Sequence, residues 1–367
     1  MPQDYEDNNI PKKNDDNSEL NKIISGKQKN PESKQMDLFK HLLKPSQNSG
    51  DLSNLLSLWD SFPKYALNRS LQTSMRNPYG GLPNYKRSYK ALNGDECTIE
   101  ISPAKITEKD GSEKDYYPSD LEESIEDLLR RLFLEQAHGI HLPNDQGSWC
   151  RFTLRMIYDK LKEQGKNRTM DDIKKALEIM KKATITITIN GEPSHEGSIL
   201  LERLIQNRTD YLKNPHAASA VRFSSLVSKG IEQLDFRQYN YEIMISLKSQ
   251  LHKYLFKLLS SKFLNAGHTA PPFAIYYSDI EQCSGLLHHS EAYRKMDIVR
   301  KAMAYLVDRY VLRSFPENPS TEGNKVTDIL FKLTPSSAFI ADMKASNKRH
   351  QMLLANRAAS RSRTPLR

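Results

Sequence analysis

The segment from Tyr293 to Tyr310 predicts a helix with two chemically different faces, and it constrains the fold more than any other stretch. At 100° per residue, apolar residues fall within one arc and are expected to face a core: Met296, Val299, Met303, Leu306 and Tyr310. The opposite side carries Arg294, Asp297, Ile298, Lys301 and Tyr305, flanked by Arg300 and Arg309. Such side chains can contact phosphates and base edges in a major groove, although most charge-rich helix faces contact only solvent.

The neighbouring segments favour the DNA-binding interpretation. Residues 246–264 repeat Leu at three- and four-residue steps and predict a long helix. Residues 273–277 predict a strand, and Ser278 with Glu281 forms a capping-box signal for a short helix that ends near Gly285. Segments 311–315 and 326–333 bracket the polar turn PENPSTEGNK as a hairpin would. This order predicts a winged helix, with Lys248 and Lys325 as backbone contacts.

The first half of the chain repeats this order without a residue-level repeat. Helices are predicted from Leu121 to near Gly139, over 153–164 and over 169–182, followed by a strand at 184–189 whose expected partner is 198–206. The third helix has a Lys-rich face, which gives the phosphate-contact candidates Lys174, Lys175, Lys181 and Lys182. We therefore predict a second winged helix here.

The preceding residues are harder to interpret. Leu52–Trp59 predicts a helical turn or two, and Asn93-Gly94 predicts a hairpin between 85–89 and 97–101. We predict an α+β chain, mainly helical, with two tandem winged-helix domains and with disordered N-terminal and basic C-terminal tails. The expected divisions are a tail at 1–50, a hairpin-bearing lead-in at 51–117, winged helices at 118–243 and 244–345, and a basic tail at 346–367.

The charge is unevenly distributed along the chain. Lys and Arg exceed Asp and Glu by nine, 54 against 45, which fits a polyanionic partner. The residues from Lys344 onward include seven Lys or Arg and no acid. The three cysteines are far apart and favour neither a disulfide framework nor a zinc site. This cysteine usage fits a reducing cytoplasm. No run approaches the roughly 18 apolar residues of a membrane helix, so no membrane contact is expected. No cofactor is expected either.

A short motif interrupts the polar N-terminal region, and it consists of Gln35, Met36, Asp37, Leu38 and Phe39. It resembles the sliding-clamp-binding motif of bacterial polymerases and their accessory factors, with Met36 in place of the usual Leu. The resemblance implies that the Leu-Phe pair enters an apolar pocket of the clamp while Gln35 bonds at its rim. A short amphipathic helix that folds back on the domain is an equal alternative.

Across about 119–334, the tandem pattern resembles the plasmid replication initiators that bind repeated origin sequences, or iterons. The segments that carry this resemblance are SLKSQLHKYLFKLLSSKFL, YSDIEQCSGLL and YRKMDIVRKAMAYLVDRYVL, with SWCRFTLRMIYDKLKEQGKNRTMDDIKKALEIMKKATITITING in the first unit. The resemblance implies an origin-binding protein without enzymatic activity, which can form dimers and recruits the host initiator and the replicative helicase. On this sequence, base readout maps to Arg294, Asp297, Ile298 and Lys301, and backbone contact to Arg300, Lys325 and Lys248.

Two other functions remain open at this point. A winged-helix transcriptional repressor would share the DNA contacts but not the clamp motif. A nicking enzyme would need a metal-binding His pair and a nucleophilic Tyr, and the nearest set is His288, His289 and Tyr293. Adjacent histidines on an extended strand point to opposite sides, which argues against such a metal site. The chain has no GxxxxGK[ST] phosphate loop, so an ATP-driven helicase is unsupported.

Overall fold

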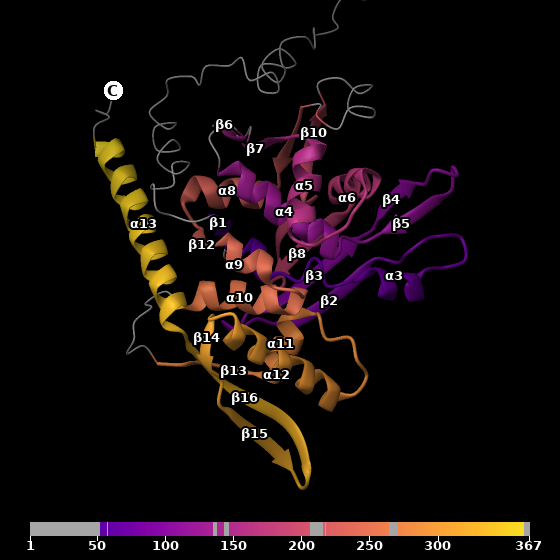
Figure 1. Ribbon diagram of the computed structural model, residues 1–367. Coiled ribbons are helices and arrows are strands. Elements are labelled where there is room, and N and C mark those ends of the chain that lie inside the picture. Colours follow the sequence, from indigo (N-terminus) through magenta and orange to yellow (C-terminus); the bar gives the residue numbers. More distant parts are fainter. Residues whose placement is uncertain are drawn as a thin grey trace, which may run out of the picture.

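The computed structural model describes residues 52–362 except 57, 135–137, 143–146, 206–215, 217 and 264–270. The chain is α+β (Figure 1). It has two large hydrophobic cores, one in each half. Strands β1–β16 make the fold less dominated by helix than the sequence predicts. The clamp-like motif at 35–39 lies outside the described residues.

The helices around the first core are η1 (Trp59–Ser61), α3 (Arg69–Met75), α4 (Asp120–Phe133), α5 (Leu154–Glu163), α6 (Met170–Lys182) and α8 (Ser225–Gln233). Two of them, α4 and α6, begin where local capping signals predict. Ser119 with Glu122 caps α4, and Thr169 with Asp172 caps α6; in each the carboxylate accepts from the backbone N–H of the N-cap residue, at 2.8 and 2.9 Å. The expectation that α4 would extend to near Gly139 was wrong, because it ends at Phe133 and Gly139 begins a strand.

The strands of this half are β1 (Leu52–Leu55), β2 (Tyr85–Lys90), β3 (Glu96–Ser102), β4 (Ala104–Thr107), β5 (Glu113–Tyr116), β6 (Gly139–Leu142), β7 (Gly147–Phe152), β8 (Thr184–Ile189), β9 (Glu192–Gly197), β10 (Leu200–Ile205) and β11 (Ser219–Phe223). One sheet has the order β2-β3-β8-β9 and another β10-β11-β7-β6, while β4 and β5 form a separate hairpin. The hairpin at Asn93-Gly94 is confirmed, with Tyr85 opposite Ile101 and Gly94 at φ +94°.

The partner predicted for β8 was wrong. Strand β8 pairs with β9 through the turn at Asn190-Gly191 and with β3 on its other side, whereas β10 joins the other sheet. Residues of the expected lead-in thus share a sheet and a core with the first unit. The helix predicted at Leu52–Trp59 was also wrong, since β1 pairs with β12 (Arg237–Asn240) and only η1 follows.

The second core is built from helices α9 (Tyr241–Ser246), α10 (Gln250–Lys262), α11 (Tyr277–Ser284) and α12 (Ala292–Asp308) and strands β13 (Phe273–Tyr276), β14 (Leu312–Ser314), β15 (Glu317–Glu322) and β16 (Lys325–Pro335). The long helix was expected to start at Ser246. It starts at Gln250 instead, because Ser246 ends α9 and Ser249 caps α10. Gly285 ends α11 in the left-handed region, as predicted, but the N-terminal cap is formed by Asp279 and the backbone of Tyr276. Ser278 donates instead to Asp328 of β16.

The ribbon after α12 is longer than the pattern suggested. Residues expected in the polar turn form β15, which pairs with β16, so the turn itself is only Gly323 and Asn324. Strand β14 pairs with the far end of β16. Tyr310, expected in the core, is exposed at φ +56° because α12 has already ended.

Helix α13 (Ser337–Ser362) runs along one side of the molecule and connects the two cores (Figure 1). Phe339 and Met343 are buried in the second core, whereas Leu353 is buried in the first. Hydrogen bonds from Ser346 to the Gln238 carbonyl (2.6 Å) and from Arg349 to the Gln238 side chain (3.0 Å) hold it against β12. The predicted basic tail is therefore helical up to Ser362.

Buried ion pairs also join the two halves. Lys257 of α10 extends its ammonium to Asp127 (2.9 Å) and Glu123 (3.4 Å) of α4. Beside them, Arg130 makes a two-point contact with Asp60, at 2.7 and 2.8 Å. Lys257 lies outside the apolar stripe of its helix, as the sequence indicates, yet it is buried because the acids it meets belong to a distant part of the chain.

Candidate nucleic-acid interface

The outward face of α12 is open to solvent. The side chains of Lys301 and Arg294 are 76% and 56% exposed. The opposite face packs into the second core through Met296, Val299, Ala302, Met303 and Leu306. The structure therefore separates the two faces as the periodicity of the helix predicts.

The charges on this face pair with each other within the helix. Lys301 lies 2.7 Å from Asp297, and Arg294 lies 2.5 Å from Glu291 and donates to the Tyr293 hydroxyl at 2.9 Å. Exposed pairs of this kind contribute little stability and are screened by salt. Their cations can therefore exchange a neighbouring carboxylate for a phosphate or a base edge at small cost.

Ile298 and Arg300, both predicted to contact DNA, also contact other parts of the protein. Ile298 is half-buried and packs against the second core, so only part of its side chain is available to a ligand. Arg300 donates to Glu317 of β15 at 2.8 Å. This bond fixes the ribbon relative to α12, so Arg300 positions the ribbon as well as adding positive charge.

Tyr305 belongs to an aromatic and basic cluster at the far end of the face. Its ring stacks on His252 of α10, with centroids 4.3 Å apart and planes 12° apart. Arg309 donates to the Tyr305 hydroxyl at 3.1 Å, and the Lys248 ammonium lies 5.9 Å from the ring. Burial and then the charge of Lys248 lower the pKa of His252. Sequence reasoning missed His252, because nothing in the pattern of α10 relates it to α12.

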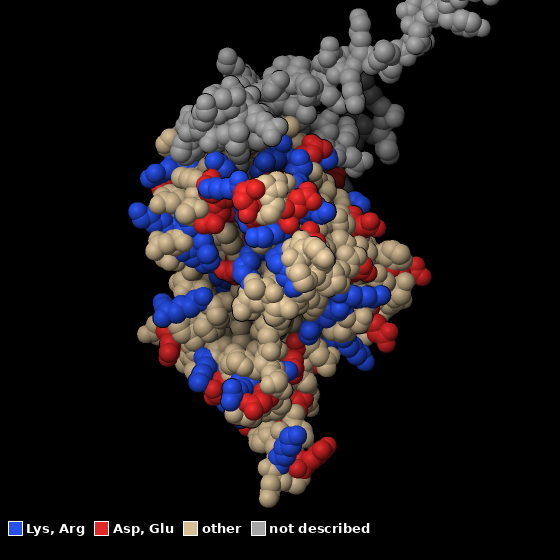
Figure 2. Space-filling model, turned by 90° about the vertical axis from the view of Figure 1, so that its right-hand side faces the viewer, with Lys and Arg blue, Asp and Glu red and all other residues tan. Residues whose placement is uncertain are grey.

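The ribbon projects from the body and carries little net charge at its end. Lys325 is exposed and lies opposite Glu322 in the register. Figure 2 shows cationic and acidic surface next to each other near this tip. The ribbon can therefore lie against a DNA backbone through Lys325 and its polar residues, but it adds only a small positive field.

The cationic face of α6 is arranged differently, because the β4–β5 hairpin packs against it. Lys175 bonds to Glu108 at the end of this hairpin, and its ammonium lies 4.0 Å from the centre of the Tyr116 ring. Lys182 pairs with Glu178 and donates to the Lys105 carbonyl. The sequence predicts that these lysines form an open face. That prediction was wrong for Lys175 and Lys182, because the hairpin packs against them.

The remaining lysines of α6 are less constrained by the hairpin. Lys174 lies 3.7 Å from Asp171, which also accepts from Lys109 of the hairpin at 2.6 Å. Lys181 is exposed. The first unit thus presents fewer available cations on its third helix than the second unit presents on α12.

His288 and Tyr293, which were considered for nicking chemistry, have different surroundings. The His288 ring is hydrogen bonded to the Ala66 carbonyl at 2.8 Å, while Tyr293 is exposed at the start of α12. Among the described residues, no group of three or more His, Cys, Asp or Glu side chains could hold a metal ion. Cys97, Cys150 and Cys283 are buried. Within the described ranges, no helix is long and apolar enough to cross a membrane.

Comparison with known proteins gives structural likenesses only. No protein-family model matches the chain, and no curated protein matches it. A structure of domains 2 and 3 of RctB is 11% identical and covers 72% of this chain and 95% of its own, with a TM-score of 0.41. A second RctB structure of these domains is also 11% identical and covers 75% of this chain and 99% of its own, at a TM-score of 0.39. The Pi initiator protein in complex with iteron DNA is 15% identical and covers 54% of this chain and 85% of its own, at a TM-score of 0.33.

Proposed function

We propose that the second unit is a winged helix that binds double-stranded DNA, with α12 in the major groove and the β15–β16 ribbon against the backbone. The observation that carries this proposal is the open outward face of α12, where Arg294, Asp297 and Lys301 project from a helix whose other face is buried. Helices α10, α11 and α12 followed by a ribbon are the order that a winged helix requires.

We further propose that the chain is a plasmid replication initiator that binds repeated origin sequences through its two units. The sequence resemblance across 119–334 and the clamp-like motif support this role over that of a simple repressor. Host helicase, host initiator and sliding clamp would be its partners, and dimers would be one of its forms. In this proposal the protein acts by binding and opening DNA, without a catalytic residue, a metal or a cofactor.

The central test measures affinity for a direct repeat taken from beside the gene. Lys301→Ala should weaken specific binding by about 1 to 3 kcal/mol if Lys301 contacts a base, and it should lower discrimination against a scrambled repeat. Lys162→Ala is the matched control, since Lys162 is an exposed lysine on α5, far along the chain from α12. Equal effects of the two changes would show that only net charge matters and would remove α12 as the reader.

Salt dependence separates the two kinds of contact. Replacing Lys325 should reduce the slope of log affinity against log salt by about 1, because each phosphate contact releases about one counterion. Replacing Asp297, which would accept a hydrogen bond from a cytosine amino group, should change sequence preference rather than the slope. Permanganate footprinting of a supercoiled origin then distinguishes an initiator, which opens the AT-rich region, from a repressor, which leaves it paired.

A further inference from the structure

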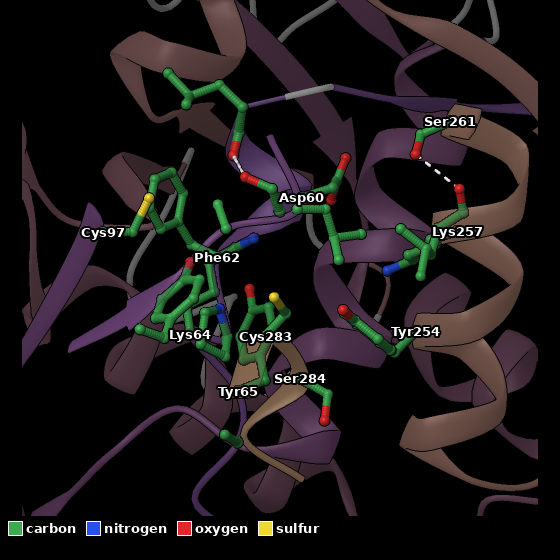
Figure 3. Close-up of a pocket in the computed structure, with 18 of the residues that line it drawn as sticks. Asp60, Phe62, Lys64, Tyr65, Cys97, Tyr254, Lys257, Ser261, Cys283 and Ser284 are labelled. Carbon is green, nitrogen blue, oxygen red and sulfur yellow. Dashed lines mark hydrogen bonds between the residues drawn. The ribbon is translucent and has the colours of Figure 1, made fainter. Parts of the chain in front are cut away.

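A cavity of about 470 Å³ lies where the two cores meet. The first half of the chain contributes residues 58–66, the β2–β3 hairpin and the end of β8, and the second half contributes α10 and α11 (Figure 3). Sites for small molecules commonly have volumes of about 300 to 1,000 Å³ and lie at such boundaries. The cavity is therefore large enough for a ligand of two or three rings.

Aromatic side chains line the cavity from both halves of the chain. They are Phe62, Tyr65, Tyr89 and Tyr254. Tyr254 packs against both cores, so its ring belongs to the boundary itself. Rings of this kind contact a flat ligand through edge-to-face and offset-stacked arrangements. The shape and lining thus favour an aromatic guest over an extended aliphatic chain.

Two phenol groups of this lining have no hydrogen-bond partner among the residues that the structure describes. The Tyr254 hydroxyl points into the cavity (Figure 3), and the Tyr89 hydroxyl also lacks a bond to any described residue. Burial raises the pKa of both groups, so both remain protonated donors at neutral pH. Neither oxygen is among the fully buried polar atoms without a partner, so each is reachable from the cavity and can donate to the acceptor atom of a guest.

Two of the buried charged groups around the cavity are paired within the chain. Lys257 is held by Asp127 and Glu123, and Asp60 by Arg130. Lys64 donates to the Trp59 carbonyl at 2.6 Å and lies over the Trp59 ring. Lys64 forms no ion pair with any described residue, so its amine can also donate to an acceptor atom of a guest.

We propose that this cavity binds a small bicyclic heteroaromatic molecule whose acceptor atoms take hydrogen bonds from Tyr254 and Tyr89. Because its walls come from both halves of the chain, the bound molecule stabilises their contact. The site is separate from the outward face of α12, and its existence does not depend on the proposed DNA function.

The test compares quinoline with naphthalene, which has the same shape but no acceptor nitrogen, by ligand-observed NMR titration of the full chain. Quinoline should bind about 2- to 10-fold tighter, the factor that one net hydrogen bond supplies. Tyr254→Phe should reduce this preference, and Tyr254→Phe combined with Tyr89→Phe should remove it, while naphthalene affinity stays unchanged. Tyr79→Phe is the matched control, since Tyr79 is 92% exposed and lies away from the cavity lining.

A second variant tests the location of the site. Ser261 lines the cavity from α10, so Ser261→Phe should fill it and abolish binding of both compounds. Circular dichroism and the urea midpoint establish that each variant is folded. The proposal is overturned if the folded wild-type chain binds neither compound, if it binds both equally, or if quinoline affinity survives both the Tyr254 and the Ser261 changes.

Discussion

Replacing Lys257 by Met should uncouple the two halves of the protein. The side chain of Lys257 is 11% exposed, and its ammonium lies 2.9 Å from Asp127 and 3.4 Å from Glu123. Burial alone would lower the pKa of Lys257, but the two carboxylates outweigh it and raise that pKa well above its usual range. The lysine therefore stays charged, and its removal leaves two acids buried beside each other.

The expected loss in the free energy of unfolding follows from these distances. At an effective dielectric constant of about 20, the two attractions amount to roughly 6 and 5 kcal/mol before the cost of burial is subtracted. Removing one partner from a buried ion pair generally costs about 3 to 5 kcal/mol, because the remaining charge is left uncompensated. Such a loss is a large part of the stability of an ordinary domain.

Urea unfolding followed by two probes measures the effect. Trp59 and Trp149 are both buried in the first half, so their fluorescence reports on that half, while circular dichroism reports on the whole chain. The two curves should separate in Lys257→Met. Adding Glu123→Gln and Asp127→Asn should recover most of the loss, because the buried charges are then gone. A loss below about 1 kcal/mol, or no recovery in the triple variant, would refute this account.

Three further predictions concern other parts of the chain. Burial lowers the pKa of Lys166 to about 8 from 10.5, so between these pH values the unfolded chain holds a proton that the folded chain lacks. The free energy of unfolding should therefore rise with pH across this window, and it should rise less in Lys166→Gln. Gly285→Ala should destabilise by about 1 kcal/mol or more in urea titration, because its φ is +63° and the new methyl would lie 3.2 Å from the Ala66 Cβ. Replacing Leu38 and Phe39 by Ala should leave DNA affinity intact and abolish clamp pull-down; retained capture would show that the motif is not used.

Patterns confined to a few neighbouring residues predicted much of this fold. The capped start of α6, the hairpin at Asn93-Gly94 and the buried stripe of α12 each depend on contacts within one helix or one turn. Their determinants lie close together in the chain, so periodicity and capping chemistry suffice to find them. The same regularity predicts which side chains of α12 point away from the core, but whether that face stays open depends on what packs over it, as the β4–β5 hairpin does over α6.

Long-range packing decided the rest. Strand β8 alternates in a way that suits several partners, and only the assembled sheet placed β3 beside it. Nothing near Lys175 indicates Glu108, and nothing near Lys257 indicates Asp127, because each pair is joined by folding across many residues. A charged side chain is exposed or buried according to what packs over it. That depends on the three-dimensional arrangement of distant segments, which one sequence without its structure does not specify.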